Sequence, residues 1–243
     1  MQTLFALLVI FTLQDKPFDS RLTALAPSFA LPALETAGAT EGRQDKWEAD
    51  IRKFEEADKK SPPPQEGVVF VGSSSIRLWK VNEAFPDLPC VNRGFGGSEM
   101  ADAAKYADRI VTPYKPRTVV VFSGGNDINS GKTPEQVCEA FEELAKKIHA
   151  SLPKTKIYYI TLFPNVKRAA QDEKCKEVNR LIQAFTKTDD RLGYVDTRSK
   201  MESPEGKARP ELLRDDGLHM NDEGYKIWNG IVGPLLRSSN LGK

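Results

Sequence analysis

A serine run and one aspartate–histidine pair are the residues of this sequence best suited to nucleophilic catalysis. The serines Ser73, Ser74 and Ser75 follow a short apolar run and a glycine, and the spacing Asp216-x-x-His219 occurs late in the chain. A serine nucleophile needs a general base, usually histidine, and the base needs an acid that orients it. Because serine runs are also ordinary turn chemistry, the run alone does not establish catalysis.

The choice of base is narrow, because the chain contains two histidines. His149 lies near the end of a predicted helix, where we interpret it as a solvated or dipole-compensating residue. His219 has a carboxylate three residues before it, across a glycine. Asp215 competes with Asp216 for the orienting role, and the three-residue spacing favours Asp216. His219 is therefore the candidate base.

Two glycine-containing segments supply groups that could stabilise the oxyanion of an acyl-transfer intermediate. Gly96-Gly97-Ser98 and Gly124-Gly125-Asn126 each follow a strand-like run. Backbone N–H groups freed by glycines, and the carboxamide of an asparagine, can donate hydrogen bonds to such an oxyanion. The glycines also suit plain turns, and Asn126 also suits a turn or a helix cap. We interpret Asp127 as a structural hydrogen-bonding residue.

Elements that would position these residues can be predicted from hydrophobic patterns. An unbroken apolar run, which is typical of a buried parallel strand, occurs at residues 68–71. Further strands are predicted at residues 88–92, 118–122, 156–162 and 193–196. Helical spacing predicts helices at residues 45–59, 99–111, 169–187 and 221–236. A further helix is predicted to begin at the capping box Thr133-Pro-Glu-Gln136, and residues 197–214 are predicted to be a loop.

The alternation of strands and helices predicts the fold class α/β. We expect a three-layer α/β/α, flavodoxin-like sandwich with a five-stranded parallel sheet, formed by residues 45–243. Residues 1–44 are expected to be a leader and linker. Ligands of open parallel sheets bind outside the carboxyl ends of the strands. The serine, glycine and asparagine segments all follow strands, so we expect them to meet the Asp216–His219 loop in one site.

In this order, the four segments resemble blocks I, II, III and V of the SGNH (GDSL) hydrolase superfamily, over residues 45–236. Gly72-Ser73-Ser74 matches block I, with Ser73 where the family often has Asp. The resemblance implies Ser74 as the nucleophile, and Ser73 or Ser75 is the alternative register. It further implies an oxyanion hole formed by the Ser74 N–H, Gly97 of block II and Asn126 of the Gly-x-Asn-Asp block III. Asp216 and His219 of block V complete the implied catalytic triad with Ser74.

The function implied by this resemblance is that of a serine esterase without a cofactor. Family analogy favours short acyl esters, such as acetyl groups on carbohydrate, as substrates. A lysophospholipase or thioesterase is the alternative within the family. Two other classes stay open: a non-catalytic carbohydrate-binding member of the fold, and a flavodoxin-like nucleotide or phosphate binder, for which the Gly-x-x-x-x-Gly-Lys and Gly-x-Gly-x-x-Gly motifs are missing.

Composition argues against several partners. A net charge of +1 gives no footprint for nucleic acid or an anionic membrane. The three cysteines, Cys90, Cys138 and Cys175, form no CxxC pair and are interpreted as buried thiols, and with two distant histidines no metal site is predicted.

The first residues of the chain bear on its location. Residues 4–13 form a ten-residue apolar run, too short to span a bilayer but suited to a signal-peptide core. No Lys or Arg precedes the run, and Ala24-Leu-Ala26 is a late cleavage site. A secreted or periplasmic location is thus one hypothesis, beside a cytoplasmic one.

Overall fold

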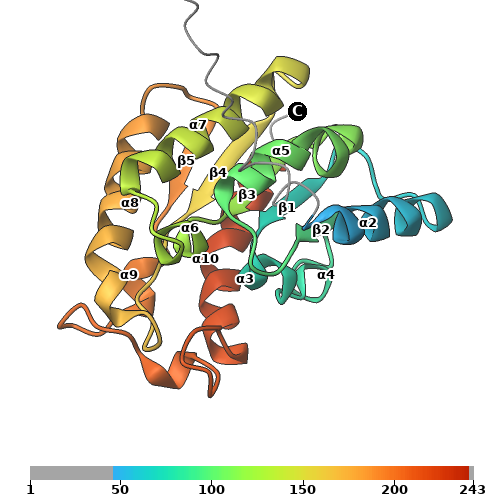
Figure 1. Ribbon diagram of the computed structural model, residues 1–243. Helices are drawn as coiled ribbons and strands as arrows, with labels where there is room; N and C mark the ends of the chain where they lie inside the picture. The colour runs from blue at the N-terminus through green and yellow to red at the C-terminus, as the bar shows by residue number, and fades with distance from the viewer. Residues whose placement is uncertain (1–45, 241–243) are drawn as a thin grey trace, which may run out of the picture. The chain divides into compact units, whose positions relative to one another are not determined.

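Five parallel strands form the sheet at the centre of the computed structural model, which describes residues 46–240 (Figure 1). In the order β2-β1-β3-β4-β5, neighbouring strands pair in parallel. Their bounds are β1 Val68–Gly72, β2 Cys90–Gly94, β3 Thr118–Phe122, β4 Lys156–Ile160 and β5 Leu192–Val195. The predicted α/β class and the five-stranded parallel sheet are confirmed.

The sheet forms from these residues because its inner strands are apolar on both faces. Every residue of β1 and of β3 is buried. A strand covered on both sides gains from a β-branched residue at every position, and valine fills six of these positions, including Val68 and Val119. Val68 pairs with Cys90 on one side and with Thr118 on the other, so the strand ends lie level at the carboxyl edge.

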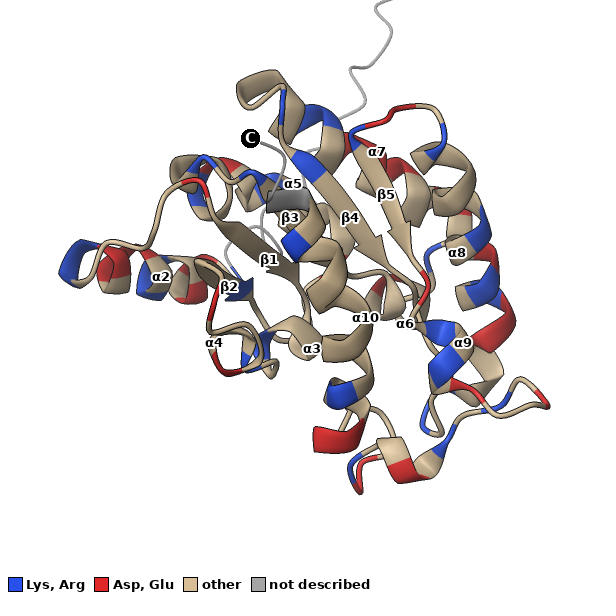
Figure 2. Ribbon diagram, turned by 180° about the vertical axis from the view of Figure 1, so that it is seen from behind, with Lys and Arg blue, Asp and Glu red and all other residues tan. Residues whose placement is uncertain are grey.

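Helices cover both faces of this sheet. The five longer ones are α2 Glu48–Lys60, α5 Met100–Ile110, α7 Pro134–Ser151, α8 Asp172–Thr186 and α10 Asp222–Asn240. Helices α5, α7 and α8 lie on one face and α10 on the other, as the two opposite views show (Figures 1 and 2). On the first face, Phe141 of α7 packs edge-on against Tyr159 of β4. On the second, the Trp228 ring of α10 lies 4.8 Å from that of Phe122 in β3.

The capping box predicted at Thr133 is confirmed. Thr133 Oγ1 accepts a hydrogen bond from the Gln136 N–H, and Gln136 Oε1 accepts one from the Thr133 N–H. These two bonds satisfy N–H groups that a helix start leaves without partners. Helix α7 therefore begins directly after Thr133 and packs against both α5 and α8.

Several short elements were not predicted. They are α3 Ser74–Arg77, α4 Val81–Ala84, α6 Gly125–Asn129, α9 Arg198–Met201 and the 3-10 turns η1 Thr112–Tyr114, η2 Ala169–Gln171 and η3 Pro210–Leu212. The prediction of a loop over residues 197–214 was wrong where α9 and η3 form. Arg198 stabilises α9 through ion pairs with Asp172 and, one turn on, with Glu202. The Arg198–Asp172 pair spans 26 residues and leaves no local pattern in the sequence.

The expected leader at residues 1–44 lies outside the described residues. Within residues 46–240, no helix combines the length and the apolar character that crossing a bilayer requires.

Candidate active site

Ser74 lies at the carboxyl edge of the sheet because β1 ends in a glycine that no other residue could replace. Gly72 has φ +144°, and a Cβ on it would lie 2.0 Å from the carbonyl oxygen of Phe122. The chain then turns so that Ser74 is the first residue of α3. Ser73 and Ser75 are buried, whereas Ser74 is partly exposed. Of the three serines, Ser74 is thus the most exposed.

His219 is held by a turn whose shape depends on Asp216. One carboxylate oxygen, Oδ1, accepts hydrogen bonds from the N–H groups of Leu218 and His219, both at 2.9 Å. The other, Oδ2, lies 2.6 Å from Nδ1 of the His219 ring. Gly217 adopts φ +63° between them, a conformation that favours glycine. A single carboxylate therefore shapes the loop and orients the imidazole.

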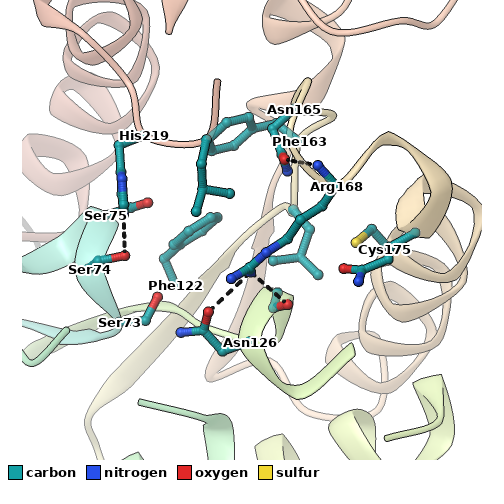
Figure 3. A pocket seen from close by; sticks show the side chains of 14 residues that line it. Ser73, Ser74, Ser75, Phe122, Asn126, Phe163, Asn165, Arg168, Cys175 and His219 are labelled. Carbon is teal, nitrogen blue, oxygen red and sulfur yellow. Dashed lines mark hydrogen bonds between the residues drawn. The ribbon is translucent and has the colours of Figure 1, made fainter. Parts of the chain in front are cut away.

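The three side chains form a continuous chain of hydrogen bonds, of which Figure 3 draws the one between His219 and Ser74. Nε2 of His219 lies 2.8 Å from Oγ of Ser74, although 145 residues separate them in sequence. The hydrogen bond with His219 holds the pKa of the Asp216 carboxyl well below its usual range, so Asp216 is ionised. An ionised Asp216 accepts the proton of Nδ1, which leaves Nε2 free to accept the Ser74 hydroxyl proton.

Tyr225 links the segment that carries His219 to the segment that carries Ser74. Its hydroxyl, on the first turns of α10, donates to the carbonyl oxygen of Ser75 in α3 at 2.8 Å. The serine and histidine come from opposite ends of the chain, so this contact fixes their relative position. Asn221 begins α10 two residues after His219 by accepting hydrogen bonds from the N–H groups of Glu223 and Gly224.

Three hydrogen-bond donors lie around Ser74. Within the described chain, neither the Ser74 N–H nor the Gly97 N–H has an acceptor, since Ser74 begins a helix and Gly97 turns with φ +80°. Asn126 Nδ2 donates one hydrogen bond, at 2.9 Å, to the carbonyl oxygen of Ser98, and its second hydrogen remains. All three residues line the cleft beside Ser74.

Arg168 is a residue of this site that the sequence analysis missed. From the segment between β4 and α8, its Nη1 donates to Oδ1 of Asn126 and to the carbonyl oxygen of Gly125, both at 3.1 Å (Figure 3). Asn165 Oδ1 accepts from the Arg168 N–H and holds that segment. The usable signal was position, because Asn165 and Arg168 follow the carboxyl end of a strand next to β3.

The space around Ser74 has two parts. An inner pocket of about 50 Å³ is walled on its apolar side by Phe122, Leu162, Phe163 and Cys175. A wider outer cleft of about 420 Å³ is lined by Arg77, Gly96, Gly97 and Asp50, among others. Ser74, Asn126, Arg168, Leu218 and His219 border both spaces. The nucleophile candidate thus lies where a small, partly apolar pocket meets a larger cleft lined mostly by polar residues.

Other residues singled out in the sequence have structural places. Asp127 is fully buried and accepts hydrogen bonds from the Met100 N–H, and burial raises the pKa of its carboxyl. The interpretation of Asp127 as structural agrees with these contacts. His149 lies in the last turn of α7, where the dipole-compensating interpretation places it, and contacts the carbonyl oxygen of Thr155. Its side chain is mostly buried, so the alternative interpretation as a solvated residue was wrong.

Arg77, Trp79, Arg93 and Phe95 flank the motifs in sequence, and of these four only Arg77 lines the outer cleft. Trp79 lies in the core, with its indole N–H donated to Asn229. Phe95 is buried as well, and Arg93 is buried beside Asp58. Each of the three cysteines is a buried free thiol, as expected. No group of three or more metal-ligating side chains gathers within residues 46–240.

Comparison with known families identifies the chain. Residues 77–227, more than half of the sequence, match the family described as GDSL-like lipase/acylhydrolase. The chain belongs to the GDSL-like lipase/acylhydrolase family. The matched residues include Gly97, Asn126, Asp216 and His219 but begin three positions after Ser74. Family membership therefore leaves the nucleophile to be argued from geometry. No curated protein matches the chain in a search of such proteins.

Solved structures of similar fold agree with this membership. A GDSL-like lipase from Bacteroides thetaiotaomicron is 19% identical, with a TM-score of 0.70 over 79% of this chain and 98% of the other. A carbohydrate esterase family 3 protein from Talaromyces cellulolyticus is 20% identical, with a TM-score of 0.58 over 70% and 96%. A variant of Axe2, an acetyl-xylooligosaccharide esterase from Geobacillus Stearmophilus, is 16% identical, with a TM-score of 0.57 over 72% and 95%. These GDSL-family and esterase structures share the fold of this chain.

Proposed function

We propose that this protein is a serine esterase that hydrolyses short acyl esters, with Ser74 as nucleophile, His219 as general base and Asp216 as the acid that orients it. The observation that carries the proposal is the 2.8 Å contact between Ser74 Oγ and His219 Nε2, at the meeting point of the two spaces. A nucleophile within hydrogen-bond reach of an oriented base is the signature of acyl transfer.

The proposed reaction has two halves. Ser74 Oγ attacks the ester carbonyl carbon and gives its proton to Nε2 of His219, while the N–H groups of Ser74 and Gly97 and the Asn126 carboxamide stabilise the oxyanion. The bond to the alcohol breaks, and the alcohol takes the proton from Nε2. Water then attacks the acyl-enzyme, again with His219 as base, which releases the acid and restores Ser74.

The size of the inner pocket supports a short acyl group. An apolar cavity of about 150 Å³ accommodates benzene, so a pocket of about 50 Å³ suits a group of a few heavy atoms, such as acetyl. The outer cleft is polar and large enough for a sugar on the alcohol side. An acetyl esterase and an acetyl-xylooligosaccharide esterase share the fold, which fits acetylated carbohydrate as the substrate class.

Hydrolysis of p-nitrophenyl acetate and release of acetate from acetylated xylooligosaccharides test this proposal. We expect turnover by the wild-type protein and its loss in Ser74→Ala and His219→Ala. His149→Ala is the matched control, because that imidazole lies outside both spaces, and it should stay active. Full activity in Ser74→Ala, or no hydrolysis of any ester by the folded protein, would refute the assignment.

A further inference from the structure

The arginines of the outer cleft differ from most others in the chain. Twelve arginines lie among residues 46–240, and nine of them pair with a carboxylate within 4.0 Å. The three without such a pair are Arg77, Arg168 and Arg214. Two of these three, Arg77 and Arg168, line the cleft beside Ser74. Two of the three guanidinium groups without a carboxylate partner thus lie where a substrate would bind.

Arg168 is the more buried of the two. It is half-buried, and its two side-chain hydrogen bonds, both from Nη1, go to neutral oxygens. Nε and Nη2 have no partner among the described residues. A partly desolvated cation without a counter-ion is costly, and burial lowers the pKa of Arg168 accordingly. An anion bound in the cleft would offset this free-energy cost by pairing with the guanidinium.

Arg77 is held at the cleft by the glycine loop. A Cβ on Gly96 would lie 2.9 Å from Nε and 3.2 Å from Nη2 of Arg77, so the guanidinium lies directly against the backbone of Gly96. A side chain at position 96 would displace the Arg77 guanidinium from this contact. It keeps an exposed cation over the loop that also carries Gly97, on the cleft side of α3.

The acidic groups around the cleft already have partners. Asp50 of α2 lines the same space and lies 3.5 Å from Lys53. Asp216 is paired with His219 and does not line the cleft. Neither carboxylate pairs with Arg77 or Arg168, so the two guanidinium groups leave the cleft with cationic donors in excess. Arginine is suited to carboxylate and phosphate because its planar group can donate two parallel hydrogen bonds.

We propose that the outer cleft binds an anionic group, carboxylate or phosphate, on the alcohol side of the ester, through Arg77 and Arg168. The inference deepens the proposed esterase function and rests on it for the statement that the ligand is a substrate. The acyl side is not the place for the anion, because the inner pocket holds only about 50 Å³ and Phe122, Leu162 and Phe163 form part of its wall. Acetylated acidic sugars and acetylated sugar phosphates share this chemistry.

Equilibrium binding to the Ser74→Ala protein tests the inference without requiring turnover. The probes are glucuronate, glucose 6-phosphate and glucose, measured by isothermal titration calorimetry. We expect at least one anion to bind about tenfold or more tightly than glucose, as one favourable charged contact allows. Which anion binds more tightly distinguishes a carboxylate from a phosphate source. Failure of both anions to bind more tightly than glucose would overturn the inference.

Two charge-removing variants locate the effect. Added to Ser74→Ala, Arg77→Gln should weaken anion binding about tenfold more than glucose binding. Lys80→Gln is the control, because Lys80 is an exposed cation three residues away that lines a different depression. Equal losses in the two variants would show a general charge effect and refute a site at Arg77. The two proposals can fail separately. If the wild-type protein hydrolyses p-nitrophenyl acetate but Ser74→Ala binds neither anion more tightly than glucose, only the anion site is refuted. If the anions bind through Arg77 but the wild-type protein hydrolyses no ester, only the esterase assignment is refuted.

Discussion

Nη1 of Arg168 donates a hydrogen bond to Oδ1 of Asn126 at 3.1 Å, and this contact decides which end of the carboxamide faces Ser98 and the cleft. With the oxygen held by a cation, Nδ2 is left as the donor. A neighbouring positive charge also polarises the amide and strengthens its N–H groups as donors. Arg168 is therefore a positioning residue for the proposed oxyanion hole.

Arg168→Gln should lower kcat for p-nitrophenyl acetate about tenfold, as expected for a charge-assisted hydrogen bond, with Arg168→Lys recovering part of the loss. The neutral substrate separates this effect from anion binding in the cleft. Arg180→Gln is the matched control, because Arg180 lies on α8 and pairs with Glu177 on the surface. A rise in KM with unchanged kcat would contradict the positioning role.

Asn126→Ala removes the side-chain donor itself. Loss of one oxyanion-hole donor costs about 10²–10³ in kcat, and we expect a fall in that range with KM little changed. Asn129→Ala is a suitable control, since Asn129 lies on the same short helix and contacts Gln171 at the surface. If steady-state kinetics give Asn126→Ala the same kcat as Asn129→Ala, the carboxamide does not stabilise the transition state.

The inner pocket should limit acyl length. We expect kcat/KM to fall from p-nitrophenyl acetate to butyrate to palmitate, because the pocket holds about 50 Å³. Leu162→Ala should raise the butyrate-to-acetate ratio by removing part of the wall. Leu144→Ala, a fully buried change outside the pocket, controls for general loosening of the core. A wild-type preference for palmitate would contradict the proposed substrate class.

Trp228 joins α10 to the sheet beneath the site, so its loss should be severe. The side chain is fully buried, and its ring packs against those of Trp79, Phe122 and Phe163. Trp228→Ala should lower the free energy of unfolding by about 3–5 kcal/mol. Trp228→Phe should cost less, because the indole N–H has no hydrogen-bond partner to lose. Urea unfolding followed by circular dichroism measures both, and equal losses would contradict this view of the packing.

The ion pairs between α2 and α5 predict a dependence of stability on pH. Hydrogen bonds from Arg109 and Arg52 lower the pKa of Glu48 to about 2. An unfolded glutamate titrates at about 4.3, so the folded state binds fewer protons between the two values. The contribution of Glu48 is therefore complete above about pH 5 and is lost as the pH falls towards 2. The difference in melting temperature between wild type and Glu48→Gln should shrink over that range. A difference that grows on acidification would contradict it.

Much of the architecture follows from local sequence patterns. The valine runs of β1 and β3 define buried strands, and the Thr133 capping box fixes the start of α7. The boundaries of β2 shift by two residues from the prediction, because Asn92 to Gly94 are polar or small and extend the strand through pairing with β1. Pairing is a tertiary effect that a local pattern does not contain.

The residues Ser74, Asn126, Asp216 and His219 could be named from the sequence because each follows a recognisable spacing. Arg168 could not, because its importance arises from a contact across 42 residues with Asn126. The division of the site into a small and a large space was also invisible, since it depends on how Phe122, Leu162 and Phe163 pack at the strand ends. Motifs thus predicted the candidate residues, and packing shapes the two spaces around them.

The central claim is that Ser74 is the nucleophile, and covalent labelling tests it most directly. The wild-type protein is treated with a fluorophosphonate, which reacts with activated serines, and the labelled peptide spanning residues 68–77 is sequenced by mass spectrometry. We predict one label, on Ser74, and no label in His219→Ala, because the hydroxyl needs its base. Labelling of Ser73 or Ser75, or equal labelling without His219, would contradict the account.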